Sequence, residues 1–437
     1  MNLKMNDEIS RRQFIEKLAY STLGVTALTH NADALETALP TFGKARRLIV
    51  VTINGGLSHT ASFDPKDHPN VNGGIGKIRT SGDFELSEFF PELSKHGNHF
   101  SVIRNMSTKS GAHSSASKIM RTSYAPNGHT IHPSVSNIIY FLKGKQHGSI
   151  PDSISISPNS DHPLGGYLPK QYSPVVIVNP LEGLRFSKAS VEAATFSNRL
   201  KILEAFNKPF EKSSAIKDVT DYHTIYEETL KLMNSKDLEL FDLSKETEQT
   251  KDRYGKNQLG YGCLLAKRLV SKNVRAVEVS TTFGVDFHND LQKSMETRMP
   301  EIDKALAALF DDLTKDGLLK DTLVVVNTEF GRTSVYAKEG IKESDNPDDY
   351  IPFNVNQGRD HQASSFSVLI GGCCKTGLAI GNTGILGNKI QGDSYQPGNL
   401  NATVGHYFGI KPDFIFNSPE GRPFTIGNHS NVIKELI

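Results

Sequence analysis

The chain has 437 residues, of which 37% are hydrophobic and 22% are charged, as in a soluble globular protein. Its 49 basic and 48 acidic residues leave a net charge of +1. This balance argues against a nucleic-acid-binding protein, which usually shows a basic excess or stripe. Three cysteines are too few for a disulfide framework, so the hydrophobic core must stabilise the fold.

The first 34 residues resemble a twin-arginine export signal. Arg11 and Arg12 precede a weakly apolar run over residues 18–28, which is too short to cross a bilayer, and an A-x-A processing sequence follows at 32–34. This pattern predicts recognition by the twin-arginine translocase and export of a folded chain to the periplasm or beyond, with no stable membrane anchor after processing. The alternative is an amphipathic N-terminal helix that is retained.

Short β-branched runs alternate with helical patterns along the rest of the chain. The helical segments carry apolar residues at three- and four-residue spacing. Predicted strands cover residues 48–53, 100–103, 175–178, 274–279, 323–326 and 366–370, and predicted helices cover 135–142, 258–270, 301–313 and 400–408. This alternation predicts an α/β fold with a mostly parallel central sheet and helices on both faces.

Two segments depart from this pattern. Residues 187–256 are polar, rich in Lys and Glu and helical in texture, which predicts an excursion or cap outside the core. Residues 336–358 contain Gly, Asn, Asp and Pro without periodicity, which predicts a long surface loop near the ligand site of the sheet.

Ligands of an open parallel sheet bind beyond the carboxyl ends of its strands, so polar residues there are candidates for a site. Asn54 and two glycines follow the first strand, although a plain tight turn explains them equally well. Asp286 and His288 follow the strand over 274–279. In an extended segment residues i and i+2 project to one side, so these two could bind one metal, or could form a surface hydrogen bond.

Two further clusters reinforce this pattern. Glu329 follows the strand over 323–326, and Asp360 and His361 precede the strand over 366–370. Each alone could be a solvated charge, but together they predict a site for a divalent metal. Carboxylate and imidazole ligands suit zinc or manganese.

A fourth cluster runs from Lys109 into a predicted helix and contains His113, Ser114 and Ser115. Small hydroxylated residues that open a helix could hold an anion on free backbone N–H groups. Ordinary N-capping by Ser114 or Ser115 is the alternative.

Across residues 46–437, as a single domain, the chain resembles the DUF1501 family of exported bacterial proteins. The residues that carry the resemblance are 48–51, Asn54-Gly55-Gly56-Leu57-Ser58-His59, Phe63-Asp64-Pro65, 102–104, 124–128, 323–333, Gly358-Arg359-Asp360-His361 and 419–423. The resemblance implies a fold similar to that of the alkaline phosphatase and sulfatase superfamily, whose members hydrolyse phosphate or sulfate esters with metals at the strand ends.

The superfamily's metal ligands transfer unevenly to this chain. Asp286, His288 and His361 resemble the ligands of one metal. Asn54 stands where a metal-binding Asp is usual, and an amide coordinates without charge. Glu329 resembles the Asp of the second metal's Asp-His pair, but the next residue is Phe330, which puts a complete two-metal site in doubt.

The nucleophile of the superfamily transfers less well. The resemblance puts His113 at the nucleophile position, where it could act as nucleophile or ligand but could not become the formylglycine of sulfatases. Ser58, Ser114 or Ser115 are the hydroxyl alternatives.

Two functions are therefore expected from the sequence. The first is an exported metal-dependent hydrolase or transferase acting on a phosphate or sulfate ester, in which Arg332 or Arg359 holds the anionic group of a small molecule or saccharide. The second is a degenerate family member that binds a ligand, polysaccharide or partner protein without turnover. Asn54, His113 and Phe330 favour the second, since each lacks a charge or nucleophile that the chemistry uses.

Overall fold

The computed structural model describes residues 41–437 except 147, 186, 188, 189, 214–216, 342, 343 and 419. The predicted export signal over 1–34 lies outside the described residues. Residues Gly43–Ile437 form one compact unit. Among the described residues, no helix is both long and apolar enough to span a membrane.

An eight-stranded sheet with the order β14-β4-β13-β8-β1-β7-β5-β6 lies at the centre of this unit. Its strands are β1 Arg47–Thr52, β4 Phe100–Met106, β5 Ser153–Ile156, β6 Val175–Ile177, β7 Ala276–Ser280, β8 Thr322–Asn327, β13 Phe366–Gly372 and β14 Ala379–Ile380. The strands β8, β1, β7, β5 and β6 run parallel, whereas β13 is antiparallel to both β4 and β8. The predicted mostly parallel sheet is thus confirmed.

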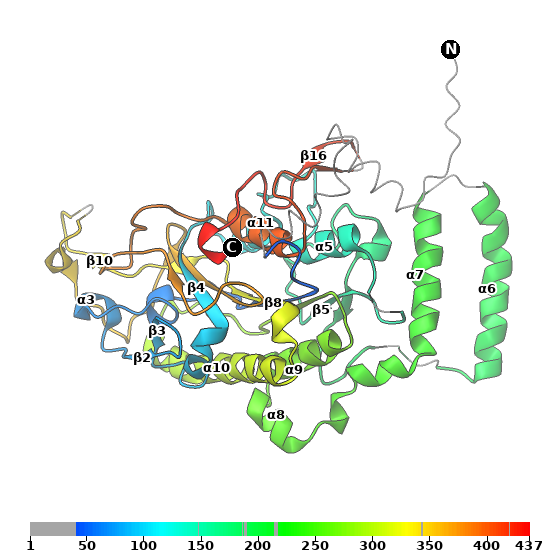
Figure 1. Cartoon of the computed structure of the whole chain (residues 1–437), viewed down its shortest axis with the longest axis horizontal. Helices are drawn as coiled ribbons and strands as arrows, with labels where there is room; N and C mark the ends of the chain where they lie inside the picture. Colours follow the sequence, from blue (N-terminus) through cyan, green and yellow to red (C-terminus); the bar gives the residue numbers. More distant parts are fainter. Residues whose placement is uncertain are drawn as a thin grey trace, which may run out of the picture. The chain divides into compact units, whose positions relative to one another are not determined.

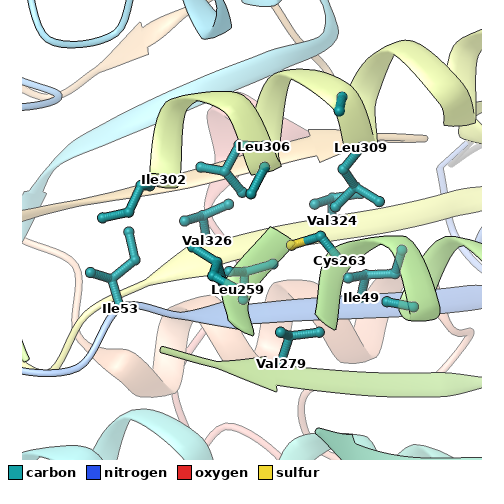
Figure 2. Close-up of a cluster of buried hydrophobic side chains, with 14 of the residues drawn as sticks. Ile49, Ile53, Leu259, Cys263, Val279, Ile302, Leu306, Leu309, Val324 and Val326 are labelled. Atoms are coloured by element: carbon teal, nitrogen blue, oxygen red, sulfur yellow. The ribbon is translucent and has the colours of Figure 1, made fainter. Parts of the chain in front are cut away.

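The sheet buries apolar side chains on both faces, because successive residues of a strand point to opposite sides. On one face, Ile49 of β1 and Val324 of β8 pack against α9 (Gln258–Ser271) and α10 (Leu291–Lys315) (Figure 2). On the other face, Leu48 and Val325 join a second core. That core includes residues of α4 (His113–Thr122), α5 (Val135–Lys143) and α11 (Pro397–Tyr407). Figure 1 shows α9 and α10 on one side of the strands and α5 and α11 on the other.

The sequence patterns missed some elements of this fold. Helix α10 begins ten residues before the predicted start at 301, because Leu291, Met295 and Met299 extend its buried face. Pro300 lies inside this longer helix. Strand β5 was not predicted, since its alternating Ser and Ile residues form no continuous apolar run. The predicted loop over 336–358 instead contains β10 (Tyr336–Ala337), paired with β11 (Tyr350–Ile351).

The described residues of the polar segment over 187–256 are mostly helical. It contains α6 (Ala193–Ser213), α7 (Lys217–Met233), η4 (Lys236–Phe241), η5 (Leu243–Lys245) and α8 (Glu248–Tyr254). Glu228 of α7 pairs with Lys145, and the next residue, Gln146, donates to the carbonyl of Arg46 just before β1. These contacts place α7 near the amino ends of the strands, away from the ends where ligands of such sheets bind.

The remaining elements are short. They are η1 His59–Ala61, α3 Pro69–Asn72, β2 Lys77–Arg79, β3 Glu85–Ser87, η2 Leu93–His99, η3 Lys170–Tyr172, η6 Leu319–Asp321, β9 Gly331–Arg332, η7 Pro347–Asp349, β12 His361–Gln362, β15 Phe416–Asn417, β16 Pro423–Phe424 and η8 Lys434–Leu436.

The register of the three central strands brings distant segments together. Thr52, the last residue of β1, lies opposite Ser280 of β7 and Asn327 of β8. The loops that follow these strands therefore leave the same edge of the sheet side by side. They carry Asn54, Asp286 and Glu329.

Substitution of Leu306 tests the core between α10 and the sheet. Leu306 is fully buried, so Leu306→Ala is expected to lower the free energy of unfolding by about 2–5 kcal/mol through lost contacts and a residual cavity. Urea unfolding measures the change. The control Lys304→Ala, at an exposed position of the same helix, should stay within about 0.5 kcal/mol of the parent. Equal effects of the two would contradict this packing.

Candidate metal centre

Three histidines gather around Asp286, in the loop after β7. The Asp286 Oδ1 atom lies 2.9 Å from His288 Nε2 and 3.1 Å from His361 Nε2, and Asp286 Oδ2 lies 3.3 Å from His113 Nε2. His113 is the first residue of α4, and His361 is the first residue of β12. The structure thus brings together three of the predicted metal ligands and His113.

The other ring nitrogen of each histidine faces a hydrogen-bond acceptor. His361 Nδ1 lies 2.8 Å from the carbonyl oxygen of Gly111, which can only accept, so this nitrogen carries the proton. His113 Nδ1 donates in the same way to Glu329 at 2.5 Å, and His288 Nδ1 to Asp360 at 3.2 Å. In the neutral imidazoles the Nε2 lone pairs are therefore directed toward Asp286, an orientation typical of metal-bound histidine.

A group of acceptors this dense needs a cation or a shared proton at its centre. His113, Asp286 and His361 each offer a ligand atom, and all three atoms lie within 4.8 Å of one another. Donor atoms bound to one tetrahedral zinc ion stand about 3.3 Å apart. The Nε2 atoms of His113 and His361 lie 3.3 and 3.1 Å from the Asp286 oxygens, close to this value, so these three residues fit a zinc ion. His288 lies beside them, and its Nε2 atom accepts from Arg332.

Arg332, the second residue of β9, donates a hydrogen bond to Asp286 and fixes its orientation. Its five N–H groups meet the carbonyls of Gly55, Gly56 and Arg359, the Nε2 atom of His288, and Asp286 Oδ1. Partial burial by itself raises the pKa of Asp286, but the hydrogen bond and charge of Arg332 outweigh it and hold that pKa below its ordinary value. Asp286 is thus a carboxylate at neutral pH, and Oδ2 is its oxygen turned from Arg332.

The predicted anion-binding role of the arginines receives no support from this geometry. Arg332 is 2% exposed and has no N–H group left to donate. Arg359 is 1% exposed and donates to the carbonyls of Val71, Thr333 and Ser334. Both side chains fix the loops around the site instead of facing a ligand.

Two glycines allow the loops to approach one another. Gly55 has a φ of +104°, and a Cβ there would lie 2.5 Å from the backbone nitrogen of Val285. A Cβ on Gly358 would collide with the backbone of His288. The first contact places the turn after β1 against the Asp286 loop, and the second places His361 within reach of the same loop.

Helix α4 presents its amino end to the cluster. Its N-cap is Ala112, without a side-chain cap, so the expected capping by Ser114 or Ser115 is wrong. The physical reason is register: because the helix begins at His113, both serines already lie in its first turn. Ser114 Oγ donates instead to Asp161 at 2.8 Å and accepts from Lys118 at 3.2 Å.

The other predicted residues lie around the cluster rather than inside it. Asn54 donates its amide to the carbonyl of Thr281, and its Oδ1 atom accepts from Asn159. Ser58 is 3% exposed, and its hydroxyl lies 3.5 Å from that of Thr60. Neither contact directs these side chains toward Asp286.

Glu329 and Phe330 lie next to His113, and Phe330 also contacts His361. The two Glu329 oxygens accept from Gly55 N–H at 3.0 Å and from His113, so the structure places Glu329 as the partner of His113 and not at the centre. The ring of Phe330 is buried, with its centroid 4.9 Å from that of His113 and 4.6 Å from that of His361.

Sequence reasoning missed a buried ionic network that anchors α4. Glu278 of β7 accepts from Arg121 of α4 at 2.9 Å, from His162 at 2.6 Å and from Ser134 at 2.7 Å. Burial by itself raises the pKa of Glu278, but His162 and Arg121 outweigh it and hold that pKa below its ordinary value. The signal in the sequence is an acidic residue between Val277 and Val279 within a strand.

Glu278→Gln tests this anchor. Arg121 would remain buried without its counter-charge, so we expect a loss of about 3–5 kcal/mol in the free energy of unfolding at pH 7. Because the pKa of Glu278 is lowered, the parent should lose this advantage as the pH falls below the ordinary range of about 4.3. Urea unfolding measures both effects. Adding Arg121→Met should recover part of the loss, and strictly additive effects would argue against the pair.

The chain is similar to several solved structures. The lipoteichoic acid synthase LtaP from Listeria monocytogenes is 11% identical, with 86% of this chain and 76% of that chain covered and a TM-score of 0.36. The sulfatase PsFucS1 from Pseudoalteromonas sp. is 9% identical, with 91% and 72% covered and a TM-score of 0.39. The alkaline phosphatase from the Antarctic bacterium TAB5 is 10% identical, with 75% and 92% covered and a TM-score of 0.32.

Identities and TM-scores of this size leave the chemistry of the site to be argued from its own residues. Among curated proteins, none matches this sequence. One family model does match, over residues 45–437, and its description is "Protein of unknown function (DUF1501)". That span includes every residue of the candidate metal centre, so the resemblance found in the sequence is confirmed and the chain belongs to the DUF1501 family.

Proposed function

We propose that the chain binds one divalent metal ion, zinc or manganese, and hydrolyses or transfers a phosphate or sulfate ester. The observation that carries the proposal is the convergence of the Nε2 atoms of His113 and His361 on the carboxylate of Asp286. When bound, such an ion supplies a Lewis acid for the ester oxygen and lowers the pKa of bound water. Zinc suits this mixed imidazole and carboxylate set best.

The chain's own groups prepare the site for an anion. The first amide of α4 to donate within the helix is that of Ala116, to the carbonyl of Ala112. The amides of His113, Ser114 and Ser115 precede it, and the first amides of a helix have no partner inside the helix. Together with the positive end of the helix dipole they offer donors to an ester anion beside His113.

Proton handling can be assigned to groups next to His113. Glu329 and Asp360 keep the protons of His113 and His288 on Nδ1, which leaves the Nε2 atoms as acceptors. Ser114 is exposed and hydrogen-bonded to Asp161, whereas Ser58 is buried, so Ser114 is the better hydroxyl candidate. Asp161 could accept the proton of Ser114 during attack on an ester.

The alternative is a protein that binds an anionic ligand or saccharide without turnover. One observation favours it: Arg332 and Arg359 are buried and committed to carbonyl groups, Asp286 or His288. No guanidinium of the described site is therefore available to stabilise charge that develops in a transition state. Turnover would depend on the metal and the helix end alone.

Residues 1–34 lead us to propose export by the twin-arginine translocase to the periplasm or beyond. A folded passenger could take up its metal in the cytoplasm before transport.

Metal content of the purified protein tests the proposal. We expect about one equivalent of zinc or manganese in the parent and roughly a tenth or less in Asp286→Ala and His361→Ala. His129→Ala, which removes an exposed histidine outside the cluster, should keep the parent's content. A parent without transition metal after purification and zinc addition would refute the metal centre.

The role of Glu329 makes a finer test. Glu329→Gln replaces one acceptor oxygen by an NH2 group. This group faces either the Gly55 N–H or His113 Nδ1, both of which donate in the parent, so the variant fixes the His113 tautomer less firmly. We expect zinc affinity to fall by about 10–100-fold, as for other groups that orient a metal-bound histidine. Competition with a fluorescent zinc chelator measures this, and circular dichroism checks that the fold is kept. Unchanged affinity would contradict the assigned orientation of His113.

Turnover separates the two functions once metal is bound. Aryl phosphates, phosphodiesters and aryl sulfates with the same leaving group should include at least one substrate that the parent cleaves and Asp286→Ala does not. A metal-loaded parent that binds these esters without cleaving them would establish the binding function instead.

A further inference from the structure

We propose that the site selects anions with a single negative charge, such as sulfate monoesters or phosphate diesters, over dianionic phosphate monoesters. The inference rests on the proposed metal centre and names the substrate class of that site. It comes from the charges that the chain places around His113, Asp286 and His361.

Among the described residues, ion pairs join the histidines of the site and Asp286 to three further charged side chains, which are Glu329, Asp360 and Arg332. Three carboxylates against one guanidinium leave two net negative charges, since the histidines are neutral when they bind a metal. One divalent ion just balances this charge. The loaded centre is therefore close to neutral before any ligand arrives.

Little further positive charge is available to a ligand. Arg332 and Arg359 are buried and donate to acceptors of the chain itself, so neither presents its guanidinium to a ligand. Lys118 Nζ lies 3.2 Å from Ser114 Oγ and 3.7 Å from the Asp161 carboxylate. The charges of Lys118 and Asp161 cancel, so this ion pair adds no net charge. Where a second metal ion would need a donor next to Glu329, the buried ring of Phe330 packs on His113 instead.

The positive source that remains suits one negative charge better than two. The amino end of α4 offers roughly half an elementary charge next to His113. A monoanion is thus partly compensated, whereas the second charge of a dianion would find no further positive charge and would lie near the carboxylates of Glu329 and Asp360.

Methyl sulfate and methyl phosphate form a matched pair of probes, because they have nearly the same shape. At pH 8 methyl sulfate carries one negative charge, whereas methyl phosphate, with a second pKa of about 6, carries two. Isothermal titration calorimetry of the zinc-loaded full chain measures both affinities without any need for turnover. We expect methyl sulfate to bind roughly tenfold or more tightly.

Asp360→Asn removes one carboxylate charge while keeping an oxygen that accepts from His288 Nδ1. Because Asp360 is 68% exposed, its effect is screened, and the preference for methyl sulfate should narrow by roughly threefold. Glu92→Gln with Lys95→Met removes an exposed ion pair at the start of η2, before β4, and should leave the preference unchanged.

Three outcomes would overturn the inference. Methyl phosphate binding as tightly as methyl sulfate in zinc-loaded protein would refute the charge argument while leaving the metal centre intact. An unchanged preference in Asp360→Asn would show that the carboxylates do not set the selectivity. If the protein takes up no zinc, or if neither probe binds the loaded form, the proposed function fails as well.

Discussion

The structure of the site depends on one electrostatic constraint, which is the convergence of hydrogen-bond acceptors on Asp286. A carboxylate and several imidazole lone pairs repel one another unless positive charge lies among them. Arg332 supplies that charge on one side of Asp286, where all of its N–H groups are used. On the other side, Asp286 Oδ2 faces the Nε2 atom of His113, and this is where the proposed metal ion would bind. The closely packed loops at Gly55 and Gly358, and the acceptors bound to the Nδ1 atoms of the histidines, keep these groups together.

The parallel sheet makes this possible because it brings together residues that are far apart in the sequence. The in-register pairing of β1 with β7 and β8 puts three loops at one edge. The network of Glu278 and Arg121 then fixes α4 against β7, so that His113 reaches the loop of Asp286. Stability and site geometry therefore share the same contacts, and a change in the buried network acts on both.

Much of this arrangement could be predicted from the sequence, because β-branched runs mark the strands and polar residues at their ends mark the site. Asp286, His288 and His361 were found in this way. The parts that could not be predicted depend on side-chain direction. No spacing shows that Arg332 turns toward the chain's own carbonyls, or that Glu329 lies behind His113. The start of α4 at His113 was missed for a similar reason, since Ser114 and Ser115 are equally plausible caps until the register of the helix is known.

The pairing of His113 with Glu329 joins residues that are 216 positions apart in the sequence. Between their strands, β4 and β8, the sheet inserts β13, which comes later in the chain than either. Contacts of such high sequence separation form slowly, because a long loop must be closed before they can be made. The donor set is thus complete only in the finished fold. Only completely folded molecules would then bind the metal ion, so the metal content of a preparation would measure its folded fraction.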